Sequence, residues 1–352
     1  MMGNKQNILL VNYEMTMTGS PKALLNLAFI YRKLGWNVNV WSFNDGPFKN
    51  IFIQNNFQIE IVSFEGSIRD KLEKFNLVIA NTIFCSKFAV YSQNYVDTIL
   101  YIMEADNISE LIENCGLDKN DILAMKKIWC VSDYAQKCIA KHLGIKNVEV
   151  VPNYVKQEKA KLCLLSKRRK MRFVVSGTIE PRKGQDIALK AYLTMPEYVQ
   201  EKCELHFVGE QPEWSIEYQK MLQKIKNDRV FFHERIENQN KLFEFYRTMD
   251  VFIVASRDES CSLVALEAAM LGKIVIISAN TGAKYLFNKS FILPTDDVIA
   301  LSKKMFRLVT NPMKYNSQGF RNWLFYKKYG SEKNTTSIIK QIMNKEEGKE
   351  NG

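Results

Sequence analysis

The chain has 352 residues, 46% of them hydrophobic and 25% charged, which is typical of about two globular domains that each bury a core. No apolar run approaches the ~20 residues that a membrane-spanning helix needs, so no such segment is predicted. The formal net charge is +11, and residues 1–153 hold 15 basic and 15 acidic side chains, so the whole excess lies in the second half. Nucleic acid, anionic lipid, a phosphorylated small ligand and an ordinary solvated surface are all compatible with that charge.

The cellular location is predicted from the N-terminal segment and the cysteines. The apolar run Ile8–Val11 is too short for the core of a signal peptide, so we expect a cytoplasmic protein. Seven cysteines are scattered without a Cys-x-x-Cys pair, which favours reduced thiols over a disulfide framework or a zinc site.

Strand and helix patterns alternate from the start of the chain. A buried strand is predicted at 7–12, a helix with a broad apolar face at 22–34, and the next strand at 37–42. The first half also contains predicted strands at 77–80, 98–103, 127–131 and 148–151, and a helix at 133–143 with Ser132 as its N-cap.

The second half repeats this alternation. Strands are predicted at 172–176, 204–208, 229–232, 251–255 and 274–278. Helices are predicted from 185 onward and at 216–226, 240–248 and 262–271. This alternation predicts an α/β fold with parallel sheets in both halves.

The domain boundaries follow from composition. Residues 154–171 are rich in charge and poor in periodic hydrophobicity, so we place a linker there, between an N-terminal domain at 1–153 and a C-terminal domain at 172–330. A C-terminal helix is predicted at 331–345, and the tail at 346–352 is predicted to be disordered. Two joined α/β domains of similar size leave a cleft, which is a preferred ligand site.

The loop after the predicted strand 251–255 is the strongest candidate site. Ligands of open α/β sheets bind outside the carboxyl ends of the strands. The first backbone N–H groups of the following helix, at Ser262, Leu263 and Val264, would form an anion site suited to a diphosphate. Glu259 and Glu267 could accept hydroxyl donors from one elongated ligand. The equally weighted alternative is a capping role for Glu267 and a solvated Glu259.

A second candidate loop follows the predicted strand 172–176. Gly177 stands where a side chain would obstruct a ligand, and Arg182 and Lys183 follow it. An arginine and a lysine at the exit of a strand can neutralise phosphates, although taken alone they could equally form an exposed basic turn.

Together the two loops resemble the signature of glycosyltransferase family 4, whose members have the GT-B fold. That signature is Gly-x-x-x-x-Arg-Lys-Gly followed by two glutamates with seven residues between them, as in residues 177–184 and at Glu259 and Glu267. Shorter stretches that resemble the family follow in the expected order along nearly the whole chain: MTGSPKALLNLA, VIANT, YIME, VPN, HFVG and SANTG. The resemblance implies two Rossmann-like, doubly wound domains that face a central cleft, and a C-terminal helix that packs back towards the first domain.

The resemblance also implies a role for each candidate residue. Arg182 and Lys183 would bind the donor diphosphate, Glu267 the ribose hydroxyls and Glu259 the hydroxyls of the donor sugar. Further residues are assigned by position in the family pattern: Gly19 in the first loop, the backbone of Arg235 and Ile236 at the base, and Asn81 and Glu104 on the acceptor side.

Three residues depart from the family pattern. Met103 replaces a usual histidine, which leaves the donor sugar open, while Glu234 and Tyr154 each replace a usual glycine. No Asp-x-Asp motif occurs, and His142, His206 and His233 are not expected to form a ligand set. We therefore expect neither a metal nor another cofactor.

The resemblance implies a retaining, metal-independent glycosyltransferase that moves a sugar from a nucleotide-diphosphate sugar to a glycan or lipid-linked acceptor, in bacterial surface polysaccharide synthesis. Nucleic acid is not an expected partner, and peripheral contact with the inner face of the membrane is kept beside a purely cytoplasmic location. Two alternatives stay open: another sugar-nucleotide enzyme, such as an epimerase or a phosphorylase, and a non-catalytic partner subunit of the same fold.

Overall fold

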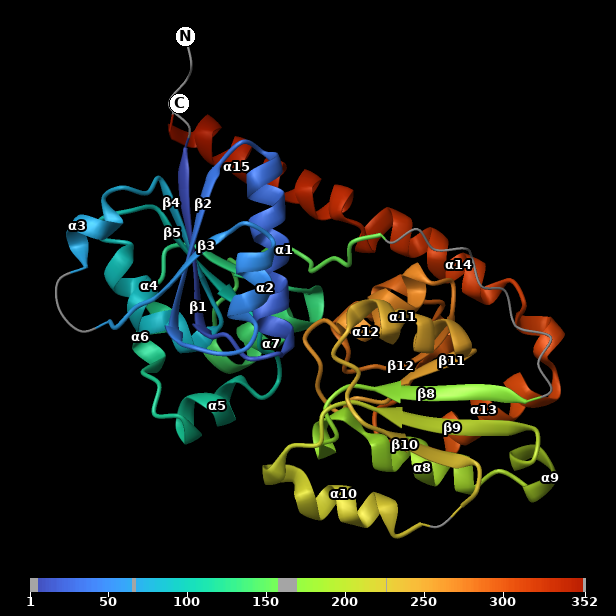
Figure 1. Ribbon diagram of the computed structural model, residues 1–352. Coiled ribbons are helices and arrows are strands. Elements are labelled where there is room, and N and C mark those ends of the chain that lie inside the picture. The colour runs from blue at the N-terminus through green and yellow to red at the C-terminus, as the bar shows by residue number, and fades with distance from the viewer. Residues whose placement is uncertain (1–5, 65–67, 158–169, 226, 351–352) are drawn as a thin grey trace. The chain divides into compact units, whose positions relative to one another are not determined.

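The protein is described by a computed structural model that covers residues 6–64, 68–157, 170–225 and 227–350. The chain divides into two compact units, one formed by Met1–Tyr154 with Thr335–Gly352 and the other by Val155–Asn334. Most of the predicted linker at 154–171 lies outside the described residues. Each unit is built around its own parallel sheet (Figure 1).

The sheet of the N-terminal unit has the strand order β3-β2-β1-β4-β5-β6-β7, with every pair parallel. Its strands are β1 (Asn7–Glu14), β2 (Asn37–Asn44), β3 (Gln58–Ile61), β4 (Leu77–Asn81), β5 (Thr98–Ile102), β6 (Ile128–Cys130) and β7 (Glu149–Val150). The chain winds outward from β1 to β3 and then returns to β4. The carboxyl ends of β1 and β4 therefore mark a switch point, where such sheets bind ligands.

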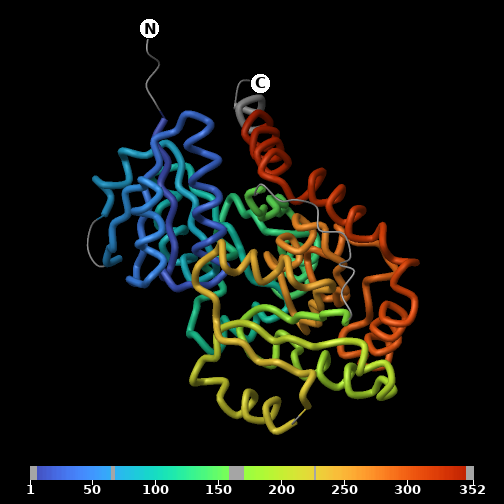
Figure 2. Tube along the Cα trace, turned by 45° about the vertical axis from the view of Figure 1, so that its right-hand side comes forward, coloured from blue at the N-terminus to red at the C-terminus, as the bar shows by residue number. Residues whose placement is uncertain are grey.

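Helices connect these strands. They are α1 (Gly19–Lys33), α2 (Lys49–Gln54), α3 (Arg69–Leu72), α4 (Ser86–Ser92), α5 (Ile108–Asn114), α6 (Lys119–Leu123) and α7 (Asp133–Leu143), with a 3-10 turn η1 (Ile83–Cys85). Helix α1 lies along β1 and β2 (Figures 1 and 2). The ends of α7 follow the sequence pattern, because the Ser132 hydroxyl accepts the Ala135 N–H at 3.1 Å and Gly144 adopts the left-handed conformation.

The last helix, α15 (Glu332–Glu350), belongs to the N-terminal unit from Thr335 onward. The Thr335 hydroxyl donates to the Pro152 carbonyl at 3.0 Å, and Ile339 and Ile342 are buried. The helix continues through Glu350, so its last residues overlap the tail predicted at 346–352. Glu and Lys, which are frequent there, have high helix propensity, and they extend a helix that packing has already started.

The sheet of the C-terminal unit has the order β10-β9-β8-β11-β12-β13, and it is also wholly parallel. Its strands are β8 (Met171–Ser176), β9 (Cys203–Val208), β10 (Val230–His233), β11 (Val251–Val254), β12 (Ile274–Ser278) and β13 (Ile292–Leu293). This is the Rossmann strand order, with its switch point between β8 and β11.

Both faces of this sheet are covered (Figure 1). Its helices are α8 (Gln185–Leu193), α9 (Glu197–Gln200), α10 (Ile216–Gln223), α11 (Gln239–Thr248), α12 (Leu263–Met270), α13 (Val298–Thr310) and α14 (Gln318–Phe325). The shorter turns are η2 (Pro181–Lys183), η3 (Glu213–Ser215), η4 (Gly282–Leu286), η5 (Lys289–Phe291), η6 (Pro312–Tyr315) and the π-helical η7 (Tyr326–Gly330). Helices α8 and α13 pack together on one face, and α11 and α12 lie on the other.

The core explains the continuous apolar strands that the sequence predicts. Phe173 and Val175 of β8 point into the cluster beneath α8 and α13, while Val174 between them is buried on the opposite face. Strands covered on both sides lose the polar alternation of half-exposed strands. The expected fold class, two Rossmann-like α/β domains, is confirmed. No helix in the described ranges is long and apolar enough to cross a membrane.

Candidate active site

The switch point of the C-terminal unit brings the two predicted loops together. Lys183, at the end of η2 after β8, contacts the Glu259 carboxylate in the loop after β11 through its ammonium group. One guanidinium nitrogen of Arg182 lies 3.7 Å from the same carboxylate oxygen, and another lies 2.6 Å from Glu180. These two cations and two carboxylates form one cluster at the carboxyl ends of β8 and β11, here called the Lys183 cluster: Glu180, Arg182, Lys183 and Glu259.

This cluster holds its charges in a largely buried place. The Lys183 and Glu259 side chains are only 19% and 15% exposed. Burial by itself raises the pKa of Glu259, but the positive charges of Lys183 and Arg182 and a hydrogen bond from the Ser262 N–H outweigh it and lower that pKa. Glu259 is thus ionised at neutral pH, and it is not the solvated residue of the alternative reading.

The start of α12 differs from the prediction in one respect. Ser262 is in the left-handed conformation with φ 73°, and its N–H donates to the Glu259 carboxylate. The sequence analysis assigns the Ser262 N–H to an anion site, whereas the backbone turn directs this group at the nearby Glu259 carboxylate. Its hydroxyl accepts the Ala265 N–H at 3.3 Å and so begins the helix, which leaves Leu263 and Val264 to present the N–H groups of the first turn.

Glu267 lies farther along α12 and is only 2% exposed. Burial, followed by the negative charge of Glu267, raises the pKa of Tyr246, which places the two side chains close together. The Tyr246 hydroxyl in turn lies 2.6 Å from the Ser176 hydroxyl at the end of β8. Glu267 thus belongs to the same strand-end region as the Lys183 cluster.

Two glycines shape the loop after β8. Gly177 has φ 133°, a backbone conformation that residues other than glycine rarely adopt. A Cβ there would touch only the aliphatic part of Lys183, so within the protein the backbone angle accounts for this glycine. Gly184 also has a positive φ, and its Cβ would overlap the Ala255 carbonyl at the end of β11. This close approach brings Lys183 to Glu259, whereas the sequence analysis uses Gly184 only as the last glycine of the family signature.

A partly buried ion pair bridges the same two loops, and the sequence analysis missed it. Arg257 donates twice to Asp186 at the start of α8, at 3.0 and 2.9 Å. Burial raises the pKa of Asp186, but hydrogen bonds from Arg257 and Tyr218 outweigh it and lower that pKa. An acidic residue in the first helical turn and an arginine in the adjoining loop are the signal that could have indicated this pair.

Three further residues that the resemblance assigns to the donor side follow β10 or begin α1. Arg235 follows β10, and its guanidinium lies 3.2 Å from Glu210, which follows β9. Ile236, beside it, is half-buried. Gly19 is the first residue of α1 in the N-terminal unit, and an added Cβ there would meet open space. Packing within the protein does not require a glycine at that position.

The switch point of the N-terminal unit carries a second polar cluster. The Asn81 amide, at the end of β4, donates to Asn12 at 2.8 Å and to the Ser20 hydroxyl at 2.9 Å. The side-chain oxygen Oδ1 of Asn81 and the Thr82 hydroxyl are buried, and neither has a hydrogen-bond partner among the described residues. Thr82 also has φ 74° and ψ 158°, a strained combination outside glycine. Buried orphan groups and strain together are typical of a functional site.

Glu104 lies beside this cluster, after β5. One carboxylate oxygen accepts the backbone N–H groups of Ile83 at 3.2 Å and Met103 at 3.0 Å. Burial raises the pKa of Glu104 to about 7, against the lowering effect of these N–H groups. The group is therefore poised between its two protonation states at neutral pH.

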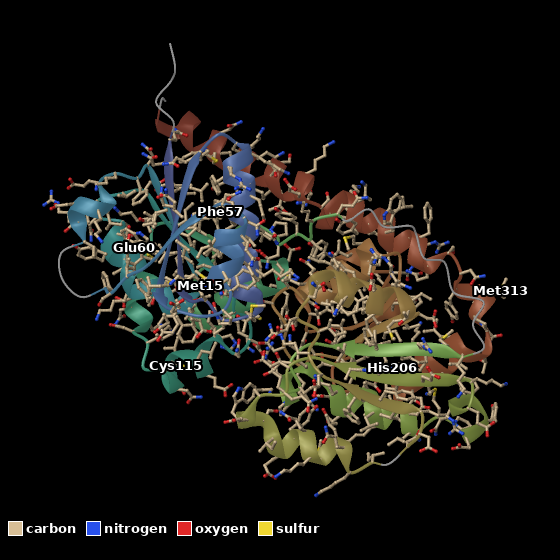
Figure 3. All side chains as sticks on the ribbon, viewed as in Figure 1. Met15, Phe57, Glu60, Cys115, His206 and Met313 are labelled. Atoms are coloured by element: carbon tan, nitrogen blue, oxygen red, sulfur yellow. The ribbon has the colours of Figure 1, made fainter. Side chains whose placement is uncertain are left out.

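The histidines do not form a metal site in the described part of the chain. His206 of β9 (Figure 3) lies 2.9 Å from His233, and its ring stacks on Phe231. Burial, and then the charge of His233, lower the pKa of His206 to about 4, so it is neutral at pH 7. Within the described ranges, no group of three or more His, Cys, Asp or Glu residues is placed to hold a metal.

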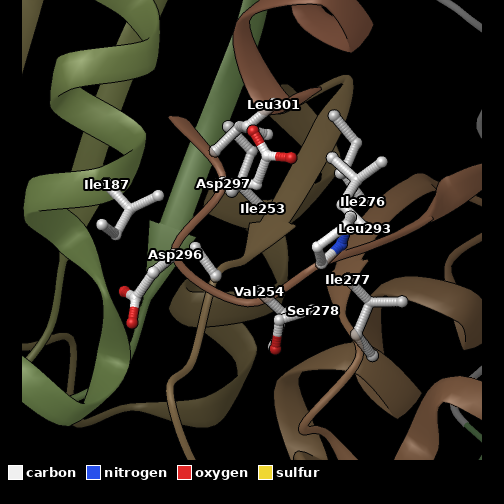
Figure 4. A pocket seen from close by; sticks show the side chains of 12 residues that line it. Ile187, Ile253, Val254, Ile276, Ile277, Ser278, Leu293, Asp296, Asp297 and Leu301 are labelled. Carbon is white, nitrogen blue, oxygen red and sulfur yellow. The ribbon is translucent and has the colours of Figure 1, made fainter. Parts of the chain in front are cut away.

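A small pocket opens at the carboxyl ends of β11, β12 and β13 (Figure 4). It encloses about 270 Å³ of empty space, including open solvent, and its lining is mostly aliphatic, with Ile187, Ile253 and Leu301 among the members. None of Arg182, Lys183, Glu259 and Glu267 lines it. An apolar hollow without these charges does not suit a diphosphate, so the candidate site is the charged cluster beside the β8–β11 switch point.

Comparisons with known proteins agree with this geometry. The chain resembles solved structures over almost its full length, which shows the fold. Alr3699/HepE from Anabaena, solved in complex with UDP-glucose, has a TM-score of 0.80 at 16% identity and covers 96% of this chain and 99% of its own. Sucrose-phosphate synthase from Thermosynechococcus elongatus has a TM-score of 0.72 at 15% identity, with 97% and 99% covered.

The family models identify the chain more directly. No curated protein sequence matches it significantly. The model of glycosyl transferases group 1 matches residues 156–321, which include the Lys183 cluster, and the model of glycosyl-transferase family 4 matches residues 4–107. The two matches succeed each other along most of the chain, and they carry the same signature residues that the structure brings together. The chain is a glycosyltransferase and belongs to glycosyltransferase family 4.

Proposed function

We propose that this protein is a retaining glycosyltransferase that takes its sugar from a nucleoside diphosphate sugar, with a UDP-sugar as the first donor to test. The contact of Lys183 and Arg182 with Glu259 at the β8–β11 switch point supports this proposal most strongly. HepE, which shares the fold, has been solved with UDP and with UDP-glucose.

In this proposal the cluster is the resting form of the donor site. A diphosphate competes with Glu259 for Lys183 and Arg182, and the first-turn N–H groups of Leu263 and Val264 add the positive end of a helix dipole. Glu259, released from Lys183, is then available to the hydroxyls of the donor sugar, and Glu267 to the ribose. Because the leaving diphosphate carries the developing charge, two fixed cations favour its departure without a metal ion.

The acceptor side is assigned to the N-terminal unit. The unpartnered oxygens of Asn81 and Thr82 suit an acceptor hydroxyl group, and Glu104 can accept a proton near neutral pH. We propose a glycan or lipid-linked acceptor in bacterial surface polysaccharide synthesis. We also propose that the protein works in the cytoplasm, in contact with the inner face of the membrane.

Replacement of Lys183 by Ala tests the donor site. Turnover of the best donor in a panel of nucleotide sugars should fall on the order of 10²-fold, comparable to the loss of one preorganised charge-stabilising donor. Lys190→Ala, on the exposed side of α8, removes the same charge from the same unit and should leave turnover within about twofold of wild type. Calorimetry with UDP should show weaker binding in Lys183→Ala. Wild-type binding and turnover in this variant would refute the assigned role, and absence of nucleotide binding in the wild type would favour a non-catalytic subunit.

A further inference from the structure

The outer side of α14 and η7 combines apolar and basic side chains. Residues 298–331 contain seven Lys or Arg residues and no Asp or Glu. Six exposed side chains at the end of this segment are here called the α14 face: Phe320, Arg321, Leu324, Phe325, Lys327 and Lys328. Their spacing of three, four and seven residues places them on one side of a helix, and the apolar members are 39–47% exposed.

The inner side of α14 is fixed to the rest of its unit. Asn322 is fully buried and donates to the Lys273 carbonyl at 2.8 Å. A Cβ at Gly319 would overlap the Gly272 carbonyl, so the two backbones touch at the turn between α12 and β12. The helix therefore has no freedom to rotate its apolar outer side inward.

Aromatic rings within the segment support the α14 face. Trp323 stacks on Phe320 with ring centroids 5.7 Å apart, and the Lys327 ammonium lies 5.9 Å from the Trp323 ring. Tyr329 stacks on Phe325 at 6.3 Å. Basic side chains next to exposed Phe, Trp and Leu are the composition of helices that lie in a membrane interface.

We propose that the α14 face docks this protein on an anionic membrane surface. The apolar side chains would enter the boundary between acyl chains and headgroups, while Arg321, Lys327 and Lys328 would meet the lipid phosphates. This proposal names the surface that makes the membrane contact suggested under the proposed function. It rests on that membrane contact and not on the sugar-transfer activity.

Two other partners fit the α14 face less well. A nucleic acid would need open ring faces on which bases stack, but Phe320 and Phe325 stack on the protein's own rings, and Leu324 offers no ring. A second copy of the chain, docked by the same face, would place Arg321, Lys327 and Lys328 of both copies in one interface, with no acidic side chain on the face to neutralise them.

Co-sedimentation with vesicles tests the proposal, and it needs neither donor nor acceptor. The full-length protein should bind vesicles that contain phosphatidylglycerol, should bind phosphatidylcholine vesicles at least tenfold more weakly, and should lose binding at high salt. Two variants, Phe320→Ser/Leu324→Ser/Phe325→Ser and Lys327→Ala/Lys328→Ala, should each weaken binding roughly tenfold or more.

A matched control uses α10 and the turn before it. Trp214, Ile216 and Met221 are 44–70% exposed, comparable to the apolar members of the α14 face, but Glu213 and Glu217 accompany them. Their replacement by Ser should change vesicle binding less than twofold. Thermal melting verifies that every variant is folded, and Arg321→Glu replaces any variant that is not. The proposal would be overturned by equal binding to both vesicle types or by unchanged binding in both α14 variants. It would also be overturned if the protein preferred an oligonucleotide to the vesicles, or if an α14 variant dissociated a dimer without weakening vesicle binding.

Discussion

Glu104 shows how a single residue couples the site of the N-terminal unit to pH. Its carboxyl group accepts two backbone N–H groups, yet burial dominates and raises the pKa to about 7. In the unfolded chain a glutamate has a pKa near its ordinary value of about 4.3. Between these two values the folded protein holds a proton that the unfolded chain has lost. The contribution of Glu104 to stability is therefore fully present at low pH and is lost as pH rises through about 7.

Replacement of Glu104 by Gln should remove this pH dependence. Between pH 5 and pH 8 the free energy of unfolding of the wild type should fall, relative to the variant, by on the order of 2 kcal/mol, because Gln does not ionise. Urea unfolding of both proteins at the two pH values measures the difference. Glu113→Gln, an exposed replacement on α5, should track the wild type. Parallel curves for wild type and Glu104→Gln would show that the carboxyl group is not shifted.

For single residues, the sequence predicts which side chains come together at the site but not which hydrogen bonds they form. The signature spacing indicates Arg182, Lys183 and Glu259 as one site, and the structure does bring them into contact. The signature spacing does not indicate that the Ser262 N–H donates to the Glu259 carboxylate, because this hydrogen bond depends on the left-handed backbone angle of Ser262. The orphan groups of Asn81 and Thr82 are equally hidden from a reading of composition and period.

The loops after β8 and β11 are placed by backbone contact as much as by charge. Gly184 comes so close to the Ala255 carbonyl that a side chain cannot be accommodated, and its φ of 68° suits glycine. Arg257 and Asp186 then bridge the same loops. The elements that carry the cations and the carboxylate are thus held together before any ligand arrives.

Replacement of Gly184 by Ala should disturb both stability and the site. Overlap with Ala255 and a left-handed angle should together cost about 2–4 kcal/mol in the free energy of unfolding, measured in urea. Gly19→Ala is the matched control, because its Cβ meets open space, and it should change stability by less than about 0.5 kcal/mol. A Gly184→Ala protein as stable as the wild type would mean that the β8 loop can move away from β11 at little cost.

Elements with strong periodicity are predicted well, and those that depend on neighbours are not. The helix predicted at 133–143 and the strand at 274–278 coincide with α7 and β12, since caps and a continuous apolar run define them locally. The edge strand β3 is absent from the prediction because its four half-exposed residues become a strand only by pairing with β2. The two residues of β13 likewise depend on their pairing with β12.

At the scale of the whole molecule, the chain returns to its first unit at the end. Helix α15 buries Ile339 and Ile342 in the N-terminal unit, although the chain has by then completed the C-terminal sheet. The stability of the first unit thus depends on residues that follow the whole second unit in the sequence. Composition predicts two domains, but the return of the helix comes only from the resemblance, because no local pattern indicates its partner.

Replacement of Ile339 and Ile342 together by Ser should destabilise the N-terminal unit by about 3–6 kcal/mol, the sum for two buried isoleucines. In differential scanning calorimetry, the transition of the N-terminal unit should move to lower temperature. UDP should still raise the transition temperature of the C-terminal unit. Lys340→Ser, exposed on the same helix, serves as the control and should leave both transitions in place. A common downward shift of all the heat absorption would instead mean that the units unfold as one.

The contact between Gly319 and Gly272 has a mechanical consequence. Where two main chains touch without side chains between them, no change of rotamer can absorb a displacement. A push on α14 must therefore move the end of α12, whose opposite end faces the Lys183 cluster. A displacement of α14 is thus passed to α12 through the main chain, and α12 begins beside the Glu259 carboxylate of the Lys183 cluster.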